Sequence, residues 1–442
     1  MVKLAKAFSS FKPFKALVLG DFLLDTYTMG RVKRISPEAP VPVIEVSSQN
    51  ARPGGAGNVV LNLMTLGAEV IAVGRVGDDD HGKELKKRLK PANTNSLLIE
   101  SRYKTPVKNR VIADSQQLIR VDFETVTPTT IELEEKVIVE LEQIIPKVQV
   151  LAISDYGKGF LTDRIIQFAL ECARRKKIPA IVDPKGIEFE KYQGSSVLKP
   201  NLSEAYAAAK CPPTASLDEV ADKLLALTDC LLITRSEAGI SLFKENQRSD
   251  FPVRSKEVKD VTGAGDTVLA IICLGLANGL DIYNSAQLSN IAAGLSIERL
   301  GCVQVNLSEL AERLLEMDSD TKIFDENHTF ALNQVLQGKR YSLLVLDKGQ
   351  MMTNGLFRMI RELSEDEEQK LIIYVRGTNP DDEFIHLLSS LNEVNCIILQ
   401  TESLKNLLGS IHPHEVFLLE EDLPVRLDPA KSLLETLITQ FA

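Results

Sequence analysis

Short apolar runs alternate with segments of helical periodicity along most of the chain. The apolar runs, which predict buried strands, are residues 16–19, 70–73, 150–153, 179–182 and 230–234. The segments with apolar positions at helical spacing, which predict helices, are residues 58–66, 131–144, 163–175, 264–277 and 285–297. This alternation predicts an α/β fold with a mainly parallel sheet.

Two stretches interrupt the alternation, because residues 41–46 and 107–123 show short alternating segments with no helix between them. They predict a small antiparallel sheet that stands apart from the main one. Lys108 and Arg110 are two positions apart in it, so both side chains point to the same face. A basic face suits a phosphorylated ligand, and a solvated strand face explains the pattern equally well.

A second α/β unit follows a polar segment at residues 316–322, which is typical of a linker. Its strands are expected at residues 343–346, 371–375, 396–399 and 416–419. We therefore expect two domains, residues 1–317 and residues 323–442, of which the second is smaller and Rossmann-like.

Composition and charge exclude several classes of protein. The 442 residues include 51 Lys and Arg against 61 Asp and Glu, and the net charge of −10 disfavours binding to nucleic acid. The most apolar stretch, residues 268–280, is shorter than the ~20 residues of a membrane helix. Residues 1–15 lack the apolar run of a signal peptide, and the six cysteines form no C-x-x-C pair. We expect a cytoplasmic protein that binds neither membrane nor nucleic acid.

The strongest chemical signal is the sequence DVTGAGDT at residues 260–267, where glycines lead into the helix expected from residue 264. The backbone amides of Gly263, Ala264 and Gly265, together with the positive end of that helix, favour developing negative charge. Asp266 suits a base that takes a proton from a hydroxyl attacking phosphorus. A glycine turn capped by Asp266 explains the same residues without any chemistry.

Residues 260–267 resemble one signature of the ribokinase-like, or PfkB-type, carbohydrate kinases, and RPGGAGN at residues 52–58 matches the other. Further blocks resemble the kinase half of D-glycero-β-D-manno-heptose 7-phosphate kinases, which serve lipopolysaccharide synthesis. These blocks are RISPEAPVPV (34–43), QQLIRVD (116–122), SDYGKG (154–159), DPKG (183–186) and PNLSE (200–204). The resemblance implies a ribokinase-like three-layer α/β/α domain with a small β lid.

The resemblance also implies a role for each matching residue around ATP. Asp266 would be the catalytic base for the anomeric hydroxyl, and Gly263, Ala264 and Gly265 would hold the transferred phosphoryl group. The N-x-x-E motif is Asn201, Leu202, Ser203 and Glu204, in which Asn201 and Glu204 would order Mg²⁺ and the ATP phosphates. Asn201 also suits a helix cap. The remaining nucleotide contacts would be Thr234, Arg235, Glu237, Gly239 and Asn290.

On the sugar side, the resemblance implies that Asp25 binds sugar hydroxyls and that Gly54, Gly55 and Asn58 lie beneath the sugar. The cations expected to bind its phosphate are Lys108, Arg110 and Lys158, with Arg34, Arg120 and Lys185 as substitutes. As in some members of the family, Asp260 and Thr262 are candidates to hold a monovalent cation such as K⁺. A near match to a P-loop at residues 77–84 is set aside, because Glu84 replaces the hydroxyl that binds magnesium.

The second domain lacks the hallmark of its expected relatives. Bifunctional members of the heptose kinase group carry an adenylyltransferase with an H-x-G-H motif, whereas His328 here has no such partner. We expect no adenylyltransferase activity, because the missing imidazoles stabilise the triphosphate in the transition state. A degenerate nucleotidyltransferase that stabilises the kinase or an oligomer is the preferred interpretation. A separate role in the loops at residues 347–349, 376–378 and 401–402 is the alternative.

The resemblance implies a kinase that uses Mg²⁺ and ATP to phosphorylate a heptose 7-phosphate at O1, and we expect a homodimer. A kinase for another sugar or sugar phosphate is one alternative. A sugar or nucleotide sensor is another, and the presence of Asp266, Asn201 and Glu204 argues against it.

Overall fold

The structure is a computed structural model. It describes residues 11–90, 92–93, 97–100, 102–114, 116–245, 247–253, 258–299, 301–317, 322–324, 336, 340–347, 350–365, 369–376, 383–399, 407–408, 411, 413–420 and 423–427. The chain divides into two compact units, a first unit Lys12–Asn306 and a second unit that begins at Leu307. The division falls at the start of helix α10 (Leu307–Met317), whereas the sequence placed it at the end of this helix.

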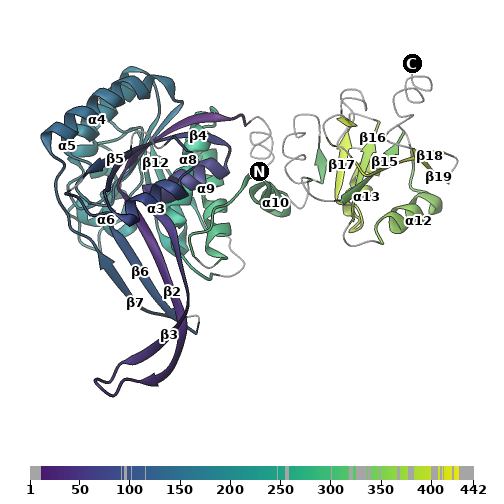
Figure 1. The fold of residues 1–442 in the computed structure, drawn as a ribbon. Helices are drawn as coiled ribbons and strands as arrows, with labels where there is room; N and C mark the ends of the chain where they lie inside the picture. The colour runs from purple at the N-terminus through teal and green to yellow at the C-terminus, as the bar shows by residue number, and fades with distance from the viewer. Residues whose placement is uncertain are drawn as a thin grey trace. The chain divides into compact units, whose positions relative to one another are not determined.

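A nine-stranded sheet forms the centre of the first unit, in the order β13-β12-β11-β10-β9-β8-β1-β4-β5 (Figure 1). Its strands are β1 (Phe14–Gly20), β4 (Ala68–Gly77), β5 (Leu97–Glu100), β8 (Val150–Ser154), β9 (Ala180–Asp183), β10 (Val197–Leu198), β11 (Leu231–Thr234), β12 (Ile240–Lys244) and β13 (Gln247–Phe251). Neighbouring strands from β11 to β5 run parallel, which confirms the expected sheet. The antiparallel hairpin of β12 and β13 was not predicted.

Helices cover both faces of this sheet (Figure 1). On one face, a core that includes Leu17, Leu151 and Ile233 is closed by α4 (Ile131–Ile144), α5 (Asp163–Arg175), α6 (Leu202–Ala208) and α7 (Leu217–Leu224). On the other face lie α2 (Ala56–Thr65), α8 (Ala264–Ala277) and α9 (Ile282–Ile297), and α3 (Asp80–Arg88) packs beside β4. Residues 266–275 of α8 are all buried, which explains why this helix is apolar around its circumference.

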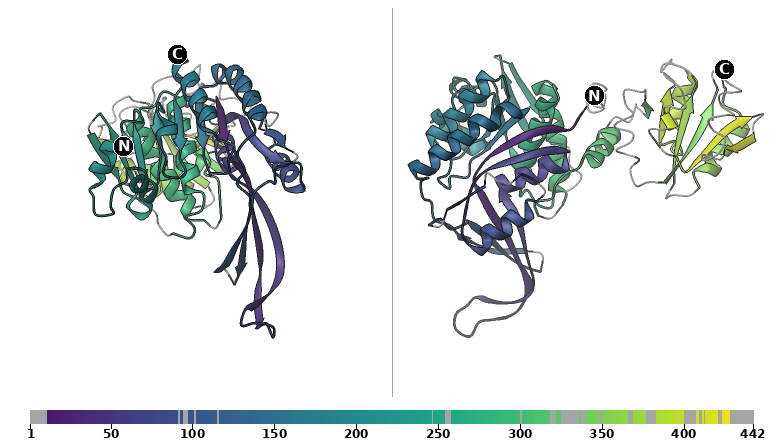
Figure 2. Two further views of the ribbon diagram at one scale, coloured as in Figure 1. Left: turned by 90° about the vertical axis from the view of Figure 1, so that its left-hand side faces the viewer. Right: turned by 45° about the horizontal axis from the view of Figure 1, so that its top comes forward.

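A four-stranded sheet in the order β3-β2-β6-β7 projects from the first unit (Figures 1 and 2). We call it the lid; its strands are β2 (Phe22–Ile35), β3 (Pro42–Gly55), β6 (Val107–Ala113) and β7 (Gln116–Phe123). The expected small sheet is therefore present, although β2 was missed. The sheet is mixed and not purely antiparallel as expected, because β2 and β6 pair in parallel. The start of β2 is buried and apolar, whereas its outer half is exposed and basic. The strand therefore has no single alternating pattern of apolar and polar residues along its length.

The second unit has a six-stranded sheet in the order β14-β17-β16-β15-β18-β19, parallel except for the last pair. Its elements are β14 (Ile323–Phe324), β15 (Arg340–Leu346), α12 (Asn354–Leu363), β16 (Gln369–Val375), α13 (Glu383–Ser390), β17 (Cys396–Leu399), β18 (Glu415–Glu420) and β19 (Leu423–Leu427). All four expected strands are present. His328 and residues 348–349, 377–378 and 401–402 lie outside the described residues.

None of the helices within the described ranges is long and apolar enough to cross a membrane. Asp78 and Asp79, part of the near match to a P-loop, connect the end of β4 to α3, and the Asp79 side chain accepts a hydrogen bond from the backbone amide of Gly82. This agrees with the expectation of an ordinary helix start.

Candidate active site

Asp266 lies in the first turn of α8 and is buried. The helix begins at Gly263, whose φ of 82° is the left-handed backbone that glycine adopts without strain. The amide of Ala264 already donates to the carbonyl of Val261 at 3.3 Å. Those of Gly263 and Gly265 have no acceptor among the described residues, so they are the amides available to an anion at this helix end.

Two side chains donate hydrogen bonds to the Asp266 carboxylate. Asn58 Nδ2, on α2, lies 2.7 Å from Oδ2, and the Tyr156 hydroxyl lies 2.9 Å from Oδ1. Burial nevertheless dominates and raises the pKa of Asp266 to about 7. A carboxyl group with that pKa exchanges its proton near neutral pH, as a general base requires.

A cavity of about 690 Å³ opens beside the start of α8. Ala264, Gly265 and Tyr156 line it at one place, and Asn201, Glu204, Thr234, Glu237, Gly239 and Asn290 also line it. The structure thus brings together most of the residues expected around ATP. The cavity is large enough for a small-molecule ligand and combines charged groups with an apolar part that includes Val253, Val258 and Ile297.

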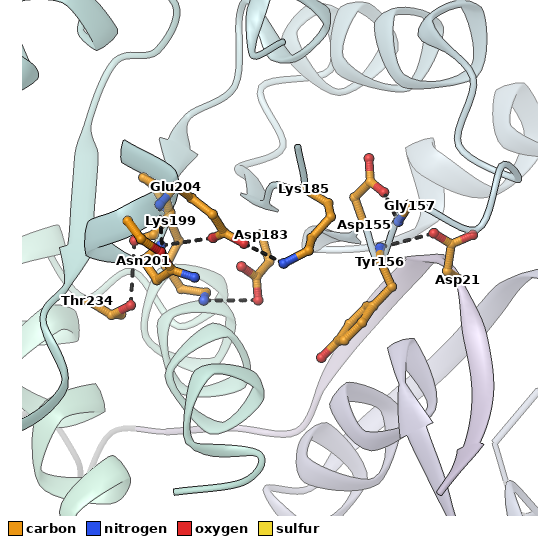
Figure 3. A network of polar contacts seen from close by, with 12 residues as sticks. Asp21, Asp155, Tyr156, Gly157, Asp183, Lys185, Lys199, Asn201, Glu204 and Thr234 are labelled. Atoms are coloured by element: carbon orange, nitrogen blue, oxygen red, sulfur yellow. Dashed lines mark hydrogen bonds and ion pairs between the residues drawn. The ribbon is translucent and has the colours of Figure 1, made fainter. Parts of the chain in front are cut away.

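The N-x-x-E segment starts α6. The Asn201 side chain accepts from the Glu204 amide at 2.9 Å and Glu204 Oε2 accepts from the Asn201 amide at 3.1 Å, so the two form a capping box. Glu204 Oε1 also pairs with Lys185 at 2.7 Å (Figure 3). Leu202 and Ser203 do not line the cavity; Ser203 donates to Asn201 instead. An amide and a carboxylate at the cavity wall are hard oxygen ligands that fit a mostly hydrated Mg²⁺.

An ion pair between Lys199 and Asp183 crosses the same wall, with Nζ 2.9 Å from Oδ2 (Figure 3). A side-chain carbon placed on Gly265 would lie 3.5 Å from Lys199 Nζ, so this ammonium reaches the start of α8. Burial raises the pKa of Asp183, and the ion pair with Lys199 offsets this increase only in part. The pair therefore lies beside the positive end of α8.

The other residues expected to contact the nucleotide lie on β11, on α9 and in the turn before β12. Thr234 ends β11, and Gly239 adopts φ 84° where any side chain would collide with the carbonyl of Phe251. Asn290 is buried in α9 and donates to the carbonyl of Pro252 at 2.8 Å. Arg235 does not line the cavity, because it pairs with Asp250 at 3.3 Å.

On the lid side, Asp25 of β2 forms a buried ion pair with Arg110 of β6. Gly54 of β3 pairs with Leu23 in the sheet, and a side chain on Gly54 would collide with the nearby Asp25 carboxylate. Gly55, at φ 57°, precedes α2 and so turns the chain toward Asn58. These residues lie on β2, at the end of β3 and at the start of α2, and their role toward a sugar stays a prediction.

The cations expected to bind a sugar phosphate differ in their surroundings. Lys158 is paired with Glu124 at 2.8 Å, and Arg110 is held by Asp25. Lys108 is half-buried and has no ion-pair partner among the residues that the structure describes. Burial and the nearby Lys158 lower its pKa, so an incoming dianion would be well placed beside it.

The substitute cations are less suited to this role. Arg120 pairs with Asp122 on the lid, and Lys185 pairs with Glu204 on the nucleotide side. Arg34 is exposed on the outer half of β2.

Asp260 holds the loop before α8. Its Oδ1 accepts from the amide and hydroxyl of Thr262, and its Oδ2 accepts from the Gly301 amide at 2.9 Å. Burial opposes ionisation of Asp260, but these hydrogen bonds outweigh it and lower the pKa. The structure therefore explains Asp260 and Thr262 as residues that shape the loop.

Sequence reasoning assigned no role to Tyr156, Asp183 or Lys199, although the first two stand in blocks that it singled out. All three follow or end parallel strands of the main sheet, where ligands bind in folds of this kind. Their position at the ends of predicted parallel strands is the sequence feature that could have identified them.

The family described as pfkB family carbohydrate kinase matches residues 15–309. Bifunctional protein HldE of Trichlorobacter lovleyi is 41% identical over 357 residues, which are 78% of this chain and 71% of that protein. Bifunctional protein HldE of Geobacter metallireducens is 36% identical over 433 residues, 95% of this chain and 86% of that protein.

Two solved structures share the fold. Arabidopsis thaliana ribokinase complexed with ribose and ATP has a TM-score of 0.55 at 16% identity, over 69% of this chain and 99% of that one. Phosphofructokinase-2 from Escherichia coli in complex with potassium has a TM-score of 0.56 at 16% identity, with the same two coverages.

Proposed function

Because the chain belongs to the pfkB family of carbohydrate kinases, we propose that its first unit transfers the γ-phosphoryl group of ATP to O1 of D-glycero-β-D-manno-heptose 7-phosphate. The product would be heptose 1,7-bisphosphate, an intermediate for ADP-heptose and lipopolysaccharide synthesis. The observation that carries the proposal is the buried Asp266 at the start of α8, beside a nucleotide-sized cavity and bonded to Asn58. The sequence blocks of the heptose kinases and the HldE relatives favour this sugar.

In this reaction Asp266 accepts the proton of the anomeric hydroxyl as its oxygen attacks phosphorus. The amides of Gly263 and Gly265 and the positive end of α8 stabilise the charge on the transferred group. Lys199 adds a cation at the same helix end. Closure of the lid over the sugar would exclude water and so limit hydrolysis of ATP.

Asn201 and Glu204 would hold Mg²⁺, which when bound would neutralise charge on the phosphates. A monovalent cation such as K⁺ remains a second proposal for the loop that Asp260 and Thr262 shape. Replacing K⁺ by Na⁺ in the assay tests it, since a bound ion makes the rate depend on which of the two is present.

A homodimer joined through the lid is also proposed. One group of exposed apolar side chains lies on its strands: Met29, Ile35, Val46, Leu118, Ile119 and Phe123. Exposed apolar side chains that gather on one sheet mark a surface that a partner can cover. Light scattering on the wild type and on Ile119→Glu tests this, because the variant should halve the mass of the particle.

For the second unit we propose that adenylyltransferase activity is absent, although the HldE relatives are named bifunctional. The support is the lack of an H-x-G-H motif in the sequence. Incubation with heptose 1-phosphate and ATP should release no pyrophosphate. Release of pyrophosphate would contradict the proposal.

The kinase proposal is tested by ADP release from Mg·ATP with three acceptors: heptose 7-phosphate, fructose 6-phosphate and ribose. We expect release with the heptose phosphate alone, and its loss in Asp266→Asn. Release with another acceptor would favour a related kinase. Binding of ATP without ADP release for any sugar would favour a sensor.

A further inference from the structure

The loop that follows β8 is held from both sides by buried carboxylates. Asp21, directly after β1, accepts hydrogen bonds at Oδ2 from the amides of Tyr156 (3.0 Å) and Lys158 (2.9 Å). Asp155 accepts from the Gly157 amide at 2.7 Å (Figure 3) and from the Tyr192 hydroxyl at 2.7 Å. Gly157 has φ 66°, a backbone that an ordinary residue adopts only with strain. The loop conformation is therefore strongly determined.

This loop presents the Tyr156 ring to the cavity and its hydroxyl to the base. The phenol oxygen lies 2.9 Å from Asp266 Oδ1, while Asn58 holds Oδ2. Burial and the neighbouring Asp266 raise the pKa of Tyr156 well above its usual value. The phenol therefore keeps its proton and acts as the donor.

We propose that Tyr156 is a positioning residue for the phosphoryl transfer, whose hydroxyl donates to Oδ1 of Asp266 and holds that carboxylate oriented and ionised. Asp21 acts through it, by fixing the loop that carries the ring. The inference rests on the proposed function, in which Asp266 is the base. It gives Tyr156, within SDYGKG (154–159), a positioning role beside Asp266.

The charged and titratable groups facing Asp266 come from several elements: Tyr156 after β8, Asp183 on β9, Lys199 after β10, and Cys302 after α9. Asp183 favours the protonated form of Asp266, whereas Lys199, Asn58 and Tyr156 favour the ionised form. Removing the Tyr156 hydroxyl must therefore raise the pKa of Asp266.

Tyr156→Phe tests the proposal through the pH profile of kcat/KM. We expect the acidic limb of the profile to move to higher pH by about one unit. The reason is that the free energy of a hydrogen bond to a charged group corresponds to a pKa shift of about one unit. At pH 6 this shift lowers kcat/KM of the variant about tenfold relative to wild type. Above pH 9 the two proteins should have the same kcat/KM. KM for ATP should not change. Tyr206→Phe, which removes a hydroxyl bonded to the carbonyl of Ala215, is the matched control and should leave the limb in place.

A second measurement does not depend on any substrate. In protein labelled with ¹³C at aspartate carboxyl groups, the Asp266 resonance is identified by its loss in Asp266→Asn, and its titration is followed by NMR. Its midpoint should rise by about one pH unit in Tyr156→Phe. It should fall when 3-fluorotyrosine, a stronger donor, replaces Tyr156. Failure of the kinase proposal would leave these shifts intact, whereas an unchanged midpoint in both variants overturns the role of Tyr156.

Discussion

Asn58 and Asp266 are joined by a hydrogen bond of 2.7 Å although 208 positions separate them in the chain. Each lies in the first turn of a helix that begins at a glycine with left-handed backbone, Gly55 for α2 and Gly263 for α8. Two glycine motifs that are independent in the sequence thus form one site. The bond fixes Oδ2 of Asp266 on the side of α2.

Asp266→Asn should bind ATP as the wild type does and turn over about 10² to 10⁴ times more slowly, the usual span for a general base. Asparagine keeps the size of the side chain and cannot accept the proton. Steady-state kinetics with calorimetric ATP binding measures both effects. Turnover near the wild-type rate would remove Asp266 from this role.

The same variant should change how stability depends on pH. The pKa of Asp266 is raised from 3.8 to about 7 in the folded protein, so between pH 4 and pH 7 the native state holds a proton that the unfolded chain has lost. Stability contributed by this group therefore falls as pH rises through that window.

Asp266→Asn does not lose this stability as the pH rises. The difference in free energy of unfolding, variant minus wild type, should therefore increase by about 2 to 4 kcal/mol between pH 4 and pH 8. Urea denaturation of the ligand-free proteins at several pH values measures the difference. Parallel pH profiles for the two proteins would show that Asp266 is ionised normally. Asp21, with a pKa raised to about 6, contributes the same trend in both proteins and cancels.

Lys108→Met should raise KM for the phosphosugar about 10- to 100-fold and leave KM for ATP unchanged, because it removes an unpaired cation near Lys158 while keeping an apolar stem. Lys104→Met, at an exposed position just before β6, is the control. Equal KM values for the two variants would exclude Lys108 as a phosphate ligand.

Glu204→Gln should raise the Mg²⁺ concentration for half-maximal rate by about tenfold, since a charged oxygen ligand becomes neutral. Glutamine still completes the capping box with Asn201, so α6 should remain intact. Glu219→Gln, at the corresponding position of α7, serves as the comparison. A shift of the same size in both variants would mean that Glu204 acts through helix stability alone.

The main sheet and its helices could be predicted because buried parallel strands and amphipathic helices leave clear periods in the sequence. Helices α4, α5 and α8 have the predicted bounds. Strand β2 was missed because one strand passes from the core to solvent, and the β12–β13 hairpin was missed because β13 is largely polar.

The candidate site was predictable where glycines and acidic groups form compact motifs, as at residues 260–267 and 201–204. Contacts between segments that are distant in the sequence could not be predicted. The ion pair of Asp25 with Arg110 depends on the parallel register of β2 and β6, and the bond from Tyr156 to Asp266 depends on a loop conformation fixed by Asp21. Neither leaves a local pattern.

The most direct test of the proposed reaction is phosphorus NMR of the product formed from ATP and heptose 7-phosphate. We expect a new phosphate resonance coupled to the anomeric proton, with the original 7-phosphate resonance retained. A new phosphate on any other carbon, or inorganic phosphate alone, would contradict transfer to O1.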